Sequence, residues 1–418
     1  MLNLIKNGLV LDQKKQDSIA REMEIFPFPK RMAVPLCSVR GMEPEIRCSP
    51  GQAVKKYDLL SLPADGFPGV PCVSPAEGII TDLRERSHPL LGDIPFAQIE
   101  VTGSYRKQMV REQPLTRYAP EEIVNIAFNA GIIDELDGVP LCEKLSSGHS
   151  PQTALAAVID EEPYVSSSVK SLLEYPRRLS EGLRLAARAC GAEKMSIHVF
   201  SEPGSESFLP QWAGGIEVTS FSAKYPVLPY YLQKQVSTLA FGPQALIALS
   251  LAAMRLKPCV RGIVTVAGDA VPRPLNLRLT YGTRLSDVLR YAGADGERNQ
   301  VLLGGPLRGA VCTDLSLPVT PGVRAITVLR PRPKALGICL GCGACIRVCP
   351  ARLQPANIMR AYEAGDLARA AAFGAEQCIG CRCCSYICPT GVPVAELAGR
   401  AKAAVQSRPD KKEGVEKA

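Results

Sequence analysis

Two runs of closely spaced cysteines near the end of the chain are the residues best suited to chemistry. They read Cys339-Leu-Gly-Cys342-Gly-Ala-Cys345-Ile-Arg-Val-Cys349-Pro350 and Cys378-Ile-Gly-Cys381-Arg-Cys383-Cys384-Ser-Tyr-Ile-Cys388-Pro389. Both contain the spacing C-x2-C-x2-C-x3-C-P, which is typical of iron–sulfur cluster ligands. The first three cysteines of such a run can reach three irons of one cubane, and in two-cluster proteins the fourth ligates the other cluster.

This rule divides eight of the cysteines between two [4Fe–4S] clusters. One cluster is assigned Cys339, Cys342, Cys345 and Cys388, and the other is assigned Cys349, Cys378, Cys381 and Cys384. A zinc site or free buried thiols are the alternatives, but zinc sites usually present paired C-x2-C knuckles without a third evenly spaced cysteine. Cys383 does not fit the repeat, and we predict that it is a buried thiol beside a cluster.

The remaining cysteines and the overall composition favour a folded protein of a reducing compartment. Seven cysteines are scattered singly before the two runs, and only three histidines are present, so neither a disulfide scaffold nor a Cys/His catalytic pair is favoured. The 418 residues are 46% hydrophobic and carry a net charge of +8 without a long Lys/Arg run, which does not indicate a nucleic-acid partner.

The start of the chain and its apolar stretches predict the location of the protein. The N-terminus lacks the apolar core and cleavage site of a secretory signal. The longest apolar stretch, Ala245–Met254, is about half of the roughly 20 residues that cross a bilayer. We therefore expect a cytoplasmic protein, which could lie on the inner face of the plasma membrane only through partner subunits.

The first third of the chain predicts a small β domain. Between Arg40 and Leu83, short apolar runs alternate with proline and glycine turns, as in a barrel-sandwich hairpin fold. This pattern resembles the biotinyl/lipoyl-carrier fold. The carrier lysine expected at the hairpin tip is missing from the segment 62–68, so we interpret the domain as structural.

Two further segments predict an α/β domain and a smaller β module. From about 115 to 257, helical periodicity in 119–130, 169–190 and 243–256 alternates with strand patterns in 195–200 and 216–220, which indicates a largely parallel sheet. After Val260, two alternating strands (263–268 and 275–280), a helix (285–292) and a return strand at Gln300 are the parts of a β-grasp fold.

These patterns predict an α/β multidomain chain of four modules and a tail. The expected boundaries are 1–105 for the carrier-like barrel-sandwich domain, 106–257 for the α/β domain, 258–330 for the β-grasp module, 331–400 for a dicluster ferredoxin-like domain, and 401–418 for a solvated tail.

The order of these modules resembles the C subunit of Rnf electron-transport complexes, from about Arg40 to Ala395. The residues that carry the resemblance are the second cysteine run with its doubled cysteine, the run Gly304-Gly305-Pro306-Leu307-Arg308-Gly309, and Gly282-Thr283 before the predicted β-grasp helix. The resemblance implies that the α/β domain is similar to a flavin-binding domain that uses FMN and NADH. It also implies an SLBB-like β-grasp module.

The chain departs from that family at its flavin-binding loop. The family's glycine-rich loop G-x-G-G-A-G-F-P is replaced by residues 131–140, with Asp134, Glu135 and Asp137 at the expected turn. A flavin phosphate needs closely approaching backbone N–H groups and disfavours nearby carboxylates. Facing carboxylates in a dry pocket would also cost several kcal/mol without a cation between them. The sequence therefore weighs against bound FMN and NADH.

The family's second flavin-binding segment survives only in part. Glu161, Glu162 and Tyr164 remain and would contact FMN if the flavin is retained, whereas the Y-P-x-G-x-E-K segment is eroded after Tyr225. The Gly304–Gly309 run could cradle a phosphate, but no lysine of a P-loop follows it, and a turn that closes the β sheet is favoured.

The residues favour an electron-transfer iron–sulfur protein that exchanges electrons with a partner protein or a membrane electron-transport complex. Four positive residues near the cysteines would compensate cluster charge or steer an acidic donor: Arg347, Arg352, Arg360 and Arg382. Two alternatives stay open: an FMN-dependent NADH oxidoreductase that feeds another metallocofactor such as a corrinoid, and a non-catalytic adaptor with structural clusters. An enzymatic activity of the chain itself is therefore left undecided.

Overall fold

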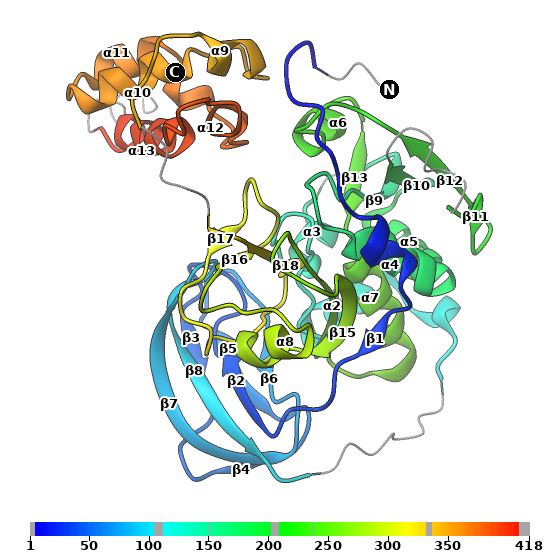
Figure 1. Ribbon diagram of the computed structural model, residues 1–418. Helices are drawn as coiled ribbons and strands as arrows, with labels where there is room; N and C mark the ends of the chain where they lie inside the picture. Colours follow the sequence, from blue (N-terminus) through cyan, green and yellow to red (C-terminus); the bar gives the residue numbers. More distant parts are fainter. Residues whose placement is uncertain are drawn as a thin grey trace.

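The computed structural model describes residues 5–103, 112–148, 150–201, 209–235, 237–331 and 337–408. It is a mixed α/β structure with four sheets, and a helical module lies beside them at the C-terminal end of the chain (Figure 1). The expected α/β class is therefore confirmed. No helix in the described parts of the chain is long and apolar enough to span a membrane.

Residues 31–101 form two antiparallel sheets with a common core. The sheets have the strand orders β2-β8-β7-β4 and β3-β5-β6. Their core contains Met32, Leu60 and Ile80, each fully buried. The strands are β2 Arg31–Pro35, β3 Pro44–Ile46, β4 Ala53–Val54, β5 Leu59–Pro63, β6 Cys72–Val73, β7 Gly78–His88 and β8 Gly92–Val101.

The middle of the chain contains the largely parallel sheet that the sequence predicts. Its order is β11-β12-β10-β9-β13, and only β11 runs antiparallel to its neighbour. The strands are β9 Thr153–Val158, β10 Lys194–Phe200, β11 Trp212–Ala213, β12 Ile216–Phe221 and β13 Thr238–Phe241. The helices of this region are α2 Pro120–Asn129, α3 Leu141–Leu145, α4 Ser167–Glu174, α5 Pro176–Cys190, α6 Leu228–Gln233 and α7 Pro243–Arg255.

The helical pattern over 169–190 is divided between α4 and α5. Tyr175, between the two helices, has φ −132° and ψ 46° because the following Pro176 disfavours the helical conformation of the residue before it. Helix α5 then packs closely on α7. An added Cβ at Gly182 would lie 1.9 Å from the carbonyl oxygen of Leu246, so only glycine permits this approach.

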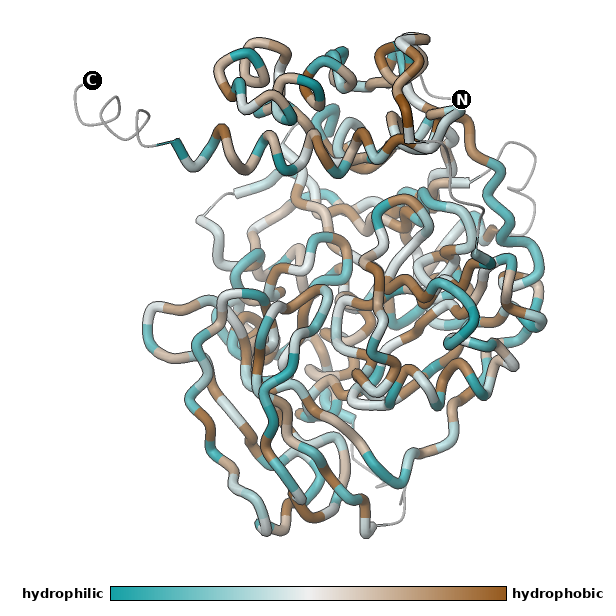
Figure 2. Tube along the Cα trace, turned by 60° about the vertical axis from the view of Figure 1, so that its left-hand side comes forward, coloured by the Kyte–Doolittle hydropathy of each residue, from teal (hydrophilic) through white to brown (hydrophobic). Residues whose placement is uncertain are grey.

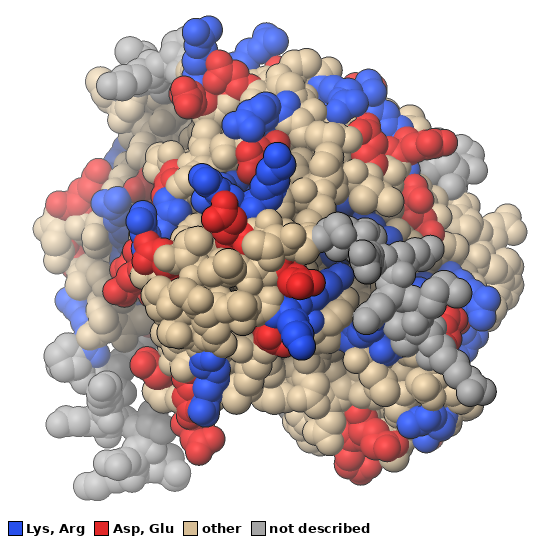
Figure 3. Space-filling view, turned by 90° about the horizontal axis from the view of Figure 1, so that it is seen from below, with Lys and Arg blue, Asp and Glu red and all other residues tan. Residues whose placement is uncertain are grey.

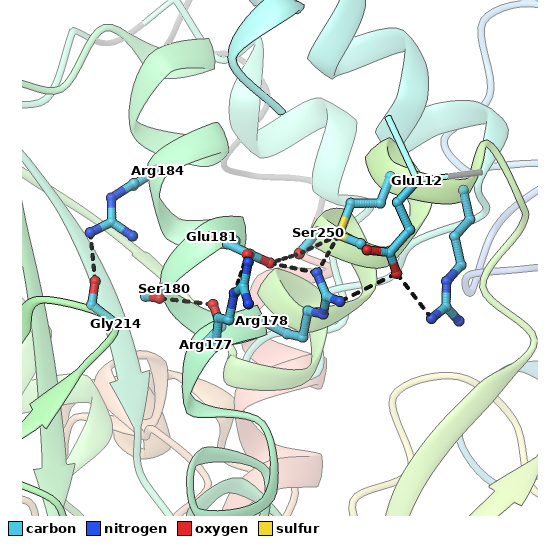
Figure 4. Close-up of polar contacts among 10 residues, drawn as sticks. Glu112, Arg177, Arg178, Ser180, Glu181, Arg184, Gly214 and Ser250 are labelled. Carbon is cyan, nitrogen blue, oxygen red and sulfur yellow. Dashed lines mark hydrogen bonds and ion pairs between the residues drawn. The ribbon is translucent and has the colours of Figure 1, made fainter. Parts of the chain in front are cut away.

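Polar contacts also join α5 and α7. The carboxylate of Glu181 accepts hydrogen bonds from Ser250 Oγ at 2.9 Å and from Arg178 at 2.9 Å (Figure 4). Arg178 also reaches Glu112 at 3.5 Å. These contacts fix the helix pair on which the acidic loop described below rests.

A six-stranded sheet of order β1-β15-β14-β18-β16-β17 includes a strand from the beginning of the chain. β1 pairs in parallel with β15, and α1 packs on the same strand, so residues 16–25 join this sheet rather than the first two. The elements are α1 Gln16–Ala20, β1 Glu24–Ile25, β14 Arg261–Ala267, β15 Leu275–Thr280, α8 Leu285–Tyr291, β16 Gln300–Leu303, β17 Ala310–Val311 and β18 Ala325–Leu329. The strands and helix expected after Val260 are confirmed.

The cysteine-rich region forms a small helical module. Its elements are α9 Ala344–Val348, α10 Pro355–Glu363, α11 Leu367–Ala372, α12 Cys383–Tyr386 and α13 Val394–Gln406. Hydrophobic and hydrophilic residues alternate along α13, which packs on α10 and α11 (Figure 2). The core between these helices contains Ile358, Ala370 and Ala401.

Candidate functional site

The cysteines of the helical module surround two cavities. A cavity of about 80 Å³ is lined by the outer cysteine group, which is Cys339, Cys342, Cys345 and Cys388. A cavity of about 20 Å³ is lined by five cysteines: the inner cysteine group, which is Cys349, Cys378, Cys381 and Cys384, and in addition Cys383. These are the groups that the sequence predicts, and four thiolates around one cavity are a suitable donor set for iron. Among the described residues, no three His, Cys, Asp or Glu side chains form a site for a single metal ion.

The backbone of each cysteine run is turned by residues in the left-handed region. Gly341, Gly343 and Gly380 have φ between 66° and 70°, where glycine has no steric penalty. Arg382 takes the place of Gly343 in the second run and has φ 61°. Both residues precede a short helix, so the same local fold positions both runs despite the different residue.

The inner cysteine group lies against the rest of the protein. Tyr225, which is 2% exposed, donates a hydrogen bond from its hydroxyl to the carbonyl oxygen of Cys381 at 2.9 Å. Asn7 donates to the carbonyl oxygen of Cys349 at 3.1 Å. Cys383 is buried here beside Leu9 and Tyr225, which confirms its prediction as a buried thiol.

The outer cysteine group lies at the surface of the module. Cys342 is exposed, and the neighbouring Ile338 and Leu340 are each 67% exposed. The guanidinium of Arg360 lies 3.3 Å from the sulfur of Cys339, and Arg347 donates to the carbonyl oxygen of Cys342 at 3.0 Å. Two of the four predicted arginines therefore contact this group.

The acidic loop 134–137 caps α7 with its own carboxylates. Glu135 accepts hydrogen bonds from the backbone N–H groups of Gln244 at 2.7 Å and Ala245 at 3.0 Å. Asp134 accepts one from the N–H of Gly242 at 2.9 Å. An N-terminal helix turn favours an anion because its N–H groups have no partner within the helix. In this protein, side-chain carboxylates take that place.

Lys144 supplies the cation that balances the charges of Asp134 and Asp137 in the acidic loop. Its ammonium lies 2.7 Å from Asp134 and 2.8 Å from Asp137. Burial would lower the pKa of Lys144, but these two carboxylates raise it overall. Burial and the charge of Asp134 raise the pKa of Glu135 to about 7. Nothing in the sequence pattern identified Lys144 as this partner.

Glu161 and Glu162 form a buried ion-pair network with Arg308. Arg308 pairs with Glu161 and, at 3.1 Å, with Glu162, and the two carboxylates are 2% and 8% exposed. Glu162 also accepts the backbone N–H groups of Leu307 at 2.8 Å and Arg308 at 3.1 Å. Glu161 accepts the N–H of Leu228 at 3.0 Å.

The turn 304–309 therefore ends the sheet, and its backbone N–H groups also bind an anion, the carboxylate of Glu162. An added Cβ at Gly305 would lie 2.4 Å from the Oε2 atom of Glu162, so the glycine permits this contact. The guanidinium of Arg308 lies 5.8 Å from the centre of the Tyr225 ring, so the network reaches the tyrosine that contacts the inner cysteine group. Tyr164 does not join the network; its N–H donates to the carbonyl of Gln13 at 2.8 Å.

The seven scattered cysteines are free thiols, as expected. Five of them are buried and two are half-buried. Burial raises the pKa of Cys37, Cys142 and Cys312 to about 11, which keeps these thiols protonated and unreactive at neutral pH.

Comparisons with known proteins bear on the whole chain. The family described as "4Fe-4S dicluster domain" matches residues 334–389. The C subunit of the proton-translocating ferredoxin:NAD(+) oxidoreductase complex of Clostridium ljungdahlii is 24% identical over 388 residues, which are 86% of this chain and 84% of that protein. The C subunit of the ion-translocating oxidoreductase complex of Rhodobacter capsulatus is 26% identical over 402 residues, and the match covers 88% of this chain and 77% of that protein.

Solved structures give a weaker similarity. The crystal structure of an NAD+-reducing [NiFe]-hydrogenase in the air-oxidised state aligns with 67% of this chain and 57% of that chain, at 18% identity and a TM-score of 0.42. The crystal structure of the H2-reduced state aligns with 73% of this chain and 69% of that chain, at 17% identity and a TM-score of 0.46.

The expected similarity to the C subunits of Rnf-type complexes is confirmed over most of the chain. Together with the dicluster domain, it supports an iron–sulfur electron-transfer subunit.

Proposed function

Because the chain is similar over most of its length to the C subunits of Rnf-type complexes, we propose that it carries two [4Fe–4S] clusters and transfers electrons between partner proteins. The outer and inner cysteine groups would each ligate one cluster, and bound clusters supply one-electron transfer. One observation carries the proposal. Cys388 of the second run lines the outer cavity with the first run, and Cys349 of the first run lines the inner cavity with the second.

The surroundings of the two groups support a route between the surface and the interior. The outer group lies beside exposed Ile338 and Leu340, which suit the small and weak interfaces of redox partners. The inner group lies beneath Tyr225. We propose that a partner protein docks at the outer group, and that this partner belongs to a membrane electron-transport complex. Membrane association at the inner face of the plasma membrane would then come through partner subunits.

We also infer the identity of the three modules that precede the cysteine-rich module. The two antiparallel sheets within 31–101 support a carrier-like barrel-sandwich domain, and the sheet of strands β9 to β13 supports a domain similar to a flavin-binding one. The strands β14 to β18 with α8 support an SLBB-like β-grasp module.

We infer that neither FMN nor NADH is a cofactor of this chain. The N–H groups at the start of α7 are engaged by Glu135, and those of the turn at Leu307 are engaged by Glu162. A flavin phosphate at either place would have to displace a buried carboxylate that already accepts these N–H groups, and in the turn this carboxylate is also paired with Arg308. This observation weighs against the FMN-dependent NADH oxidoreductase.

Iron and acid-labile sulfide counts on anaerobically purified protein test the cluster assignment. We expect about eight irons in the native protein, according to the composition of two cubanes. Cys388→Ser and Cys349→Ser should each disturb one cluster and leave the spectrum of the other. Cys383→Ser is the matched control and should retain both clusters. Colourless protein that contains zinc, or loss of both clusters in Cys383→Ser, would contradict the assignment.

Electron paramagnetic resonance during reduction tests the electron-transfer role. We expect dithionite to reduce both clusters and NADH to reduce neither, without stoichiometric flavin. Clusters that resist dithionite while the fold depends on them would instead support the adaptor. Tight stoichiometric FMN would overturn our interpretation of Glu135.

A further inference from the structure

An internal repeat relates the two halves of the cysteine-rich module. Each cysteine of the first run recurs after the same interval in the second run, so that Cys339 corresponds to Cys378. The helices that follow the runs obey the same repeat, since α10 begins at Pro355 and α13 at the corresponding Val394. The two halves therefore place similar backbone around the two cysteine groups, and side chains that break the repeat distinguish them.

Hydrogen bonds from the backbone to the cysteine sulfurs follow the repeat. The N–H of Leu353 donates to the sulfur of Cys349 in the inner group at 3.4 Å. The N–H of Val392 donates to the sulfur of Cys388 in the outer group, also at 3.4 Å. Because both groups receive this hydrogen bond, it does not distinguish them.

A cation at a backbone carbonyl is also common to both groups. Arg347 donates to the carbonyl oxygen of Cys342 in the outer group at 3.0 Å, and Lys402 donates to that of Cys378 in the inner group at 2.8 Å. In the described structure, neither cation is hydrogen-bonded to a sulfur.

Arg360 breaks the repeat. It lies on α10, and its guanidinium donates to the sulfur of Cys339 in the outer group at 3.3 Å. The corresponding residue of α13 is Gly399, which has no side chain that could make this contact. Arg382 lines the inner cavity, but among the described residues no arginine or lysine side chain is hydrogen-bonded to a sulfur of the inner group. Arg308, on the buried side of that group, is already paired with two carboxylates.

The chain segments that contain the two cysteine runs have no acidic residue. Segments 337–362 and 377–395 contain four arginines and no aspartate or glutamate. At the opposite end of the molecule, seen from below, acidic and basic side chains are intermixed (Figure 3). The positive charge of Arg360 is therefore directed at a cysteine sulfur and not at a neighbouring acid of its own segment.

The two groups also differ in their exposure to water. Cys342 of the outer group is exposed, whereas Cys349 and Cys384 of the inner group are buried. Reduction by one electron adds one negative charge to a cluster. A cation or a hydrogen bond at a ligand sulfur stabilises this charge, as does exposure to water, and each raises the reduction potential. Both differences between the groups therefore act in the same direction.

We propose that Arg360, acting through the sulfur of Cys339, raises the reduction potential of the outer cluster above that of the inner cluster. Passage of one electron from the inner to the outer cluster makes and breaks no bond. The electron would then reside beside the exposed Ile338 and Leu340, where the proposed partner docks. This inference rests on the two clusters of the proposed function and makes Arg360 a positioning residue of the electron transfer.

A redox titration of the full-length protein, followed by electron paramagnetic resonance, tests the proposal. The signal that changes in Cys388→Ser identifies the outer cluster, and we expect this cluster to have the higher potential in the native protein. Arg360→Met should shift its reduction equilibrium about tenfold toward the oxidised form, which is about 59 mV for one electron. The equilibrium of the inner cluster should change less than about twofold. Arg360→Lys keeps a cation and should give a potential closer to the native value.

Arg400→Met is the matched control. It also removes one exposed arginine from the module, but Arg400 is paired with Glu396 and lines neither cavity, so the outer cluster should shift less than about twofold. Circular dichroism and iron content confirm that each variant is folded and loaded.

Three results would overturn the proposal: an unchanged potential of the outer cluster in Arg360→Met, equal shifts in Arg360→Met and Arg400→Met, or a lower potential of the outer than of the inner cluster in the native protein. Native protein without two clusters would instead overturn the cluster assignment, and this inference with it.

Discussion

Replacement of Arg308 by methionine tests how strongly the buried carboxylates depend on this guanidinium. The variant keeps much of the apolar volume but leaves Glu161 and Glu162, which are 2% and 8% exposed, without the cation that contacts both. Removing one partner of a buried ion pair costs about 3–5 kcal/mol. Since Arg308 itself is 31% exposed and water can enter the gap, we expect a loss at the lower end, about 3 kcal/mol.

Urea unfolding followed by far-ultraviolet circular dichroism under anaerobic conditions measures this loss. Arg400→Met is the matched control, because the pair Arg400–Glu396 has a similar distance of 2.7 Å but is 61% and 58% exposed. Exposed pairs contribute about 0–1 kcal/mol. A loss in Arg308→Met no larger than that in Arg400→Met would refute the reasoning.

A triple variant distinguishes two contributions to the loss of stability in Arg308→Met: the unpaired charges of Glu161 and Glu162, and the lost packing of the Arg308 side chain. Glu161→Gln, Glu162→Gln and Arg308→Met together remove all three charges, and the glutamine carbonyls can still accept the backbone N–H groups. We expect it to be more stable than Arg308→Met alone, because no buried charge lacks a counterion. Equal stabilities would assign the loss to packing.

Four further substitutions test individual positions. Burial, and then the neighbouring carboxylate of Asp134, raise the pKa of Glu135 from 4.5 to about 7, so ionisation of Glu135 destabilises the fold as pH rises through this range. Glu135→Gln cannot ionise and should therefore remove about 3 kcal/mol of this loss of unfolding free energy. Unfolding at pH 5 and at pH 8 measures the difference. Gly182→Ala places a Cβ 1.9 Å from the carbonyl of Leu246 and should cost at least about 2 kcal/mol in thermal unfolding. Gly399→Ala in α13, with no atom within 4 Å of the added Cβ, should instead gain up to about 1 kcal/mol; a gain at both glycines would contradict the close packing of α5 on α7. Arg382→Gly should raise the melting temperature, because glycine adopts the left-handed backbone conformation at this position without the steric strain of about 1 kcal/mol that arginine has there. A lower melting temperature would contradict this.

Many of the helices and strands could be predicted from local sequence patterns. Strand and helix periodicities located β14, β15 and α7 within two residues of their observed ends, because burial of one face imposes these periods on the sequence. The break at Tyr175 was also encoded locally, in the proline that follows it, but the apolar period on both sides concealed it.

Contacts between residues far apart in the sequence could not be predicted in the same way. Lys144 is ten residues from Asp134, and Arg308 is 146 residues from Glu162, and nothing local distinguishes these cations from those at the surface. The pairing of β1 with β15 has the same origin, since a two-residue strand carries too short a pattern to indicate its neighbour. The cysteine groups are the exception, because cluster chemistry fixes which distant cysteines must converge.

The carboxylates of Glu135 and Glu162 occupy backbone N–H groups of a kind that can bind a phosphate. The free N–H groups at the start of α7 and in the turn at Leu307 require an acceptor once they are buried, whether or not a ligand is present. Glu135 and Glu162 provide one from within the chain, and Lys144 and Arg308 balance charge in the same two places. A phosphate could bind at either place only by displacing a carboxylate that is already hydrogen-bonded. We therefore infer that Glu135→Gln alone would not permit a phosphate to bind at the start of α7, because the amide oxygen would keep the same N–H groups occupied.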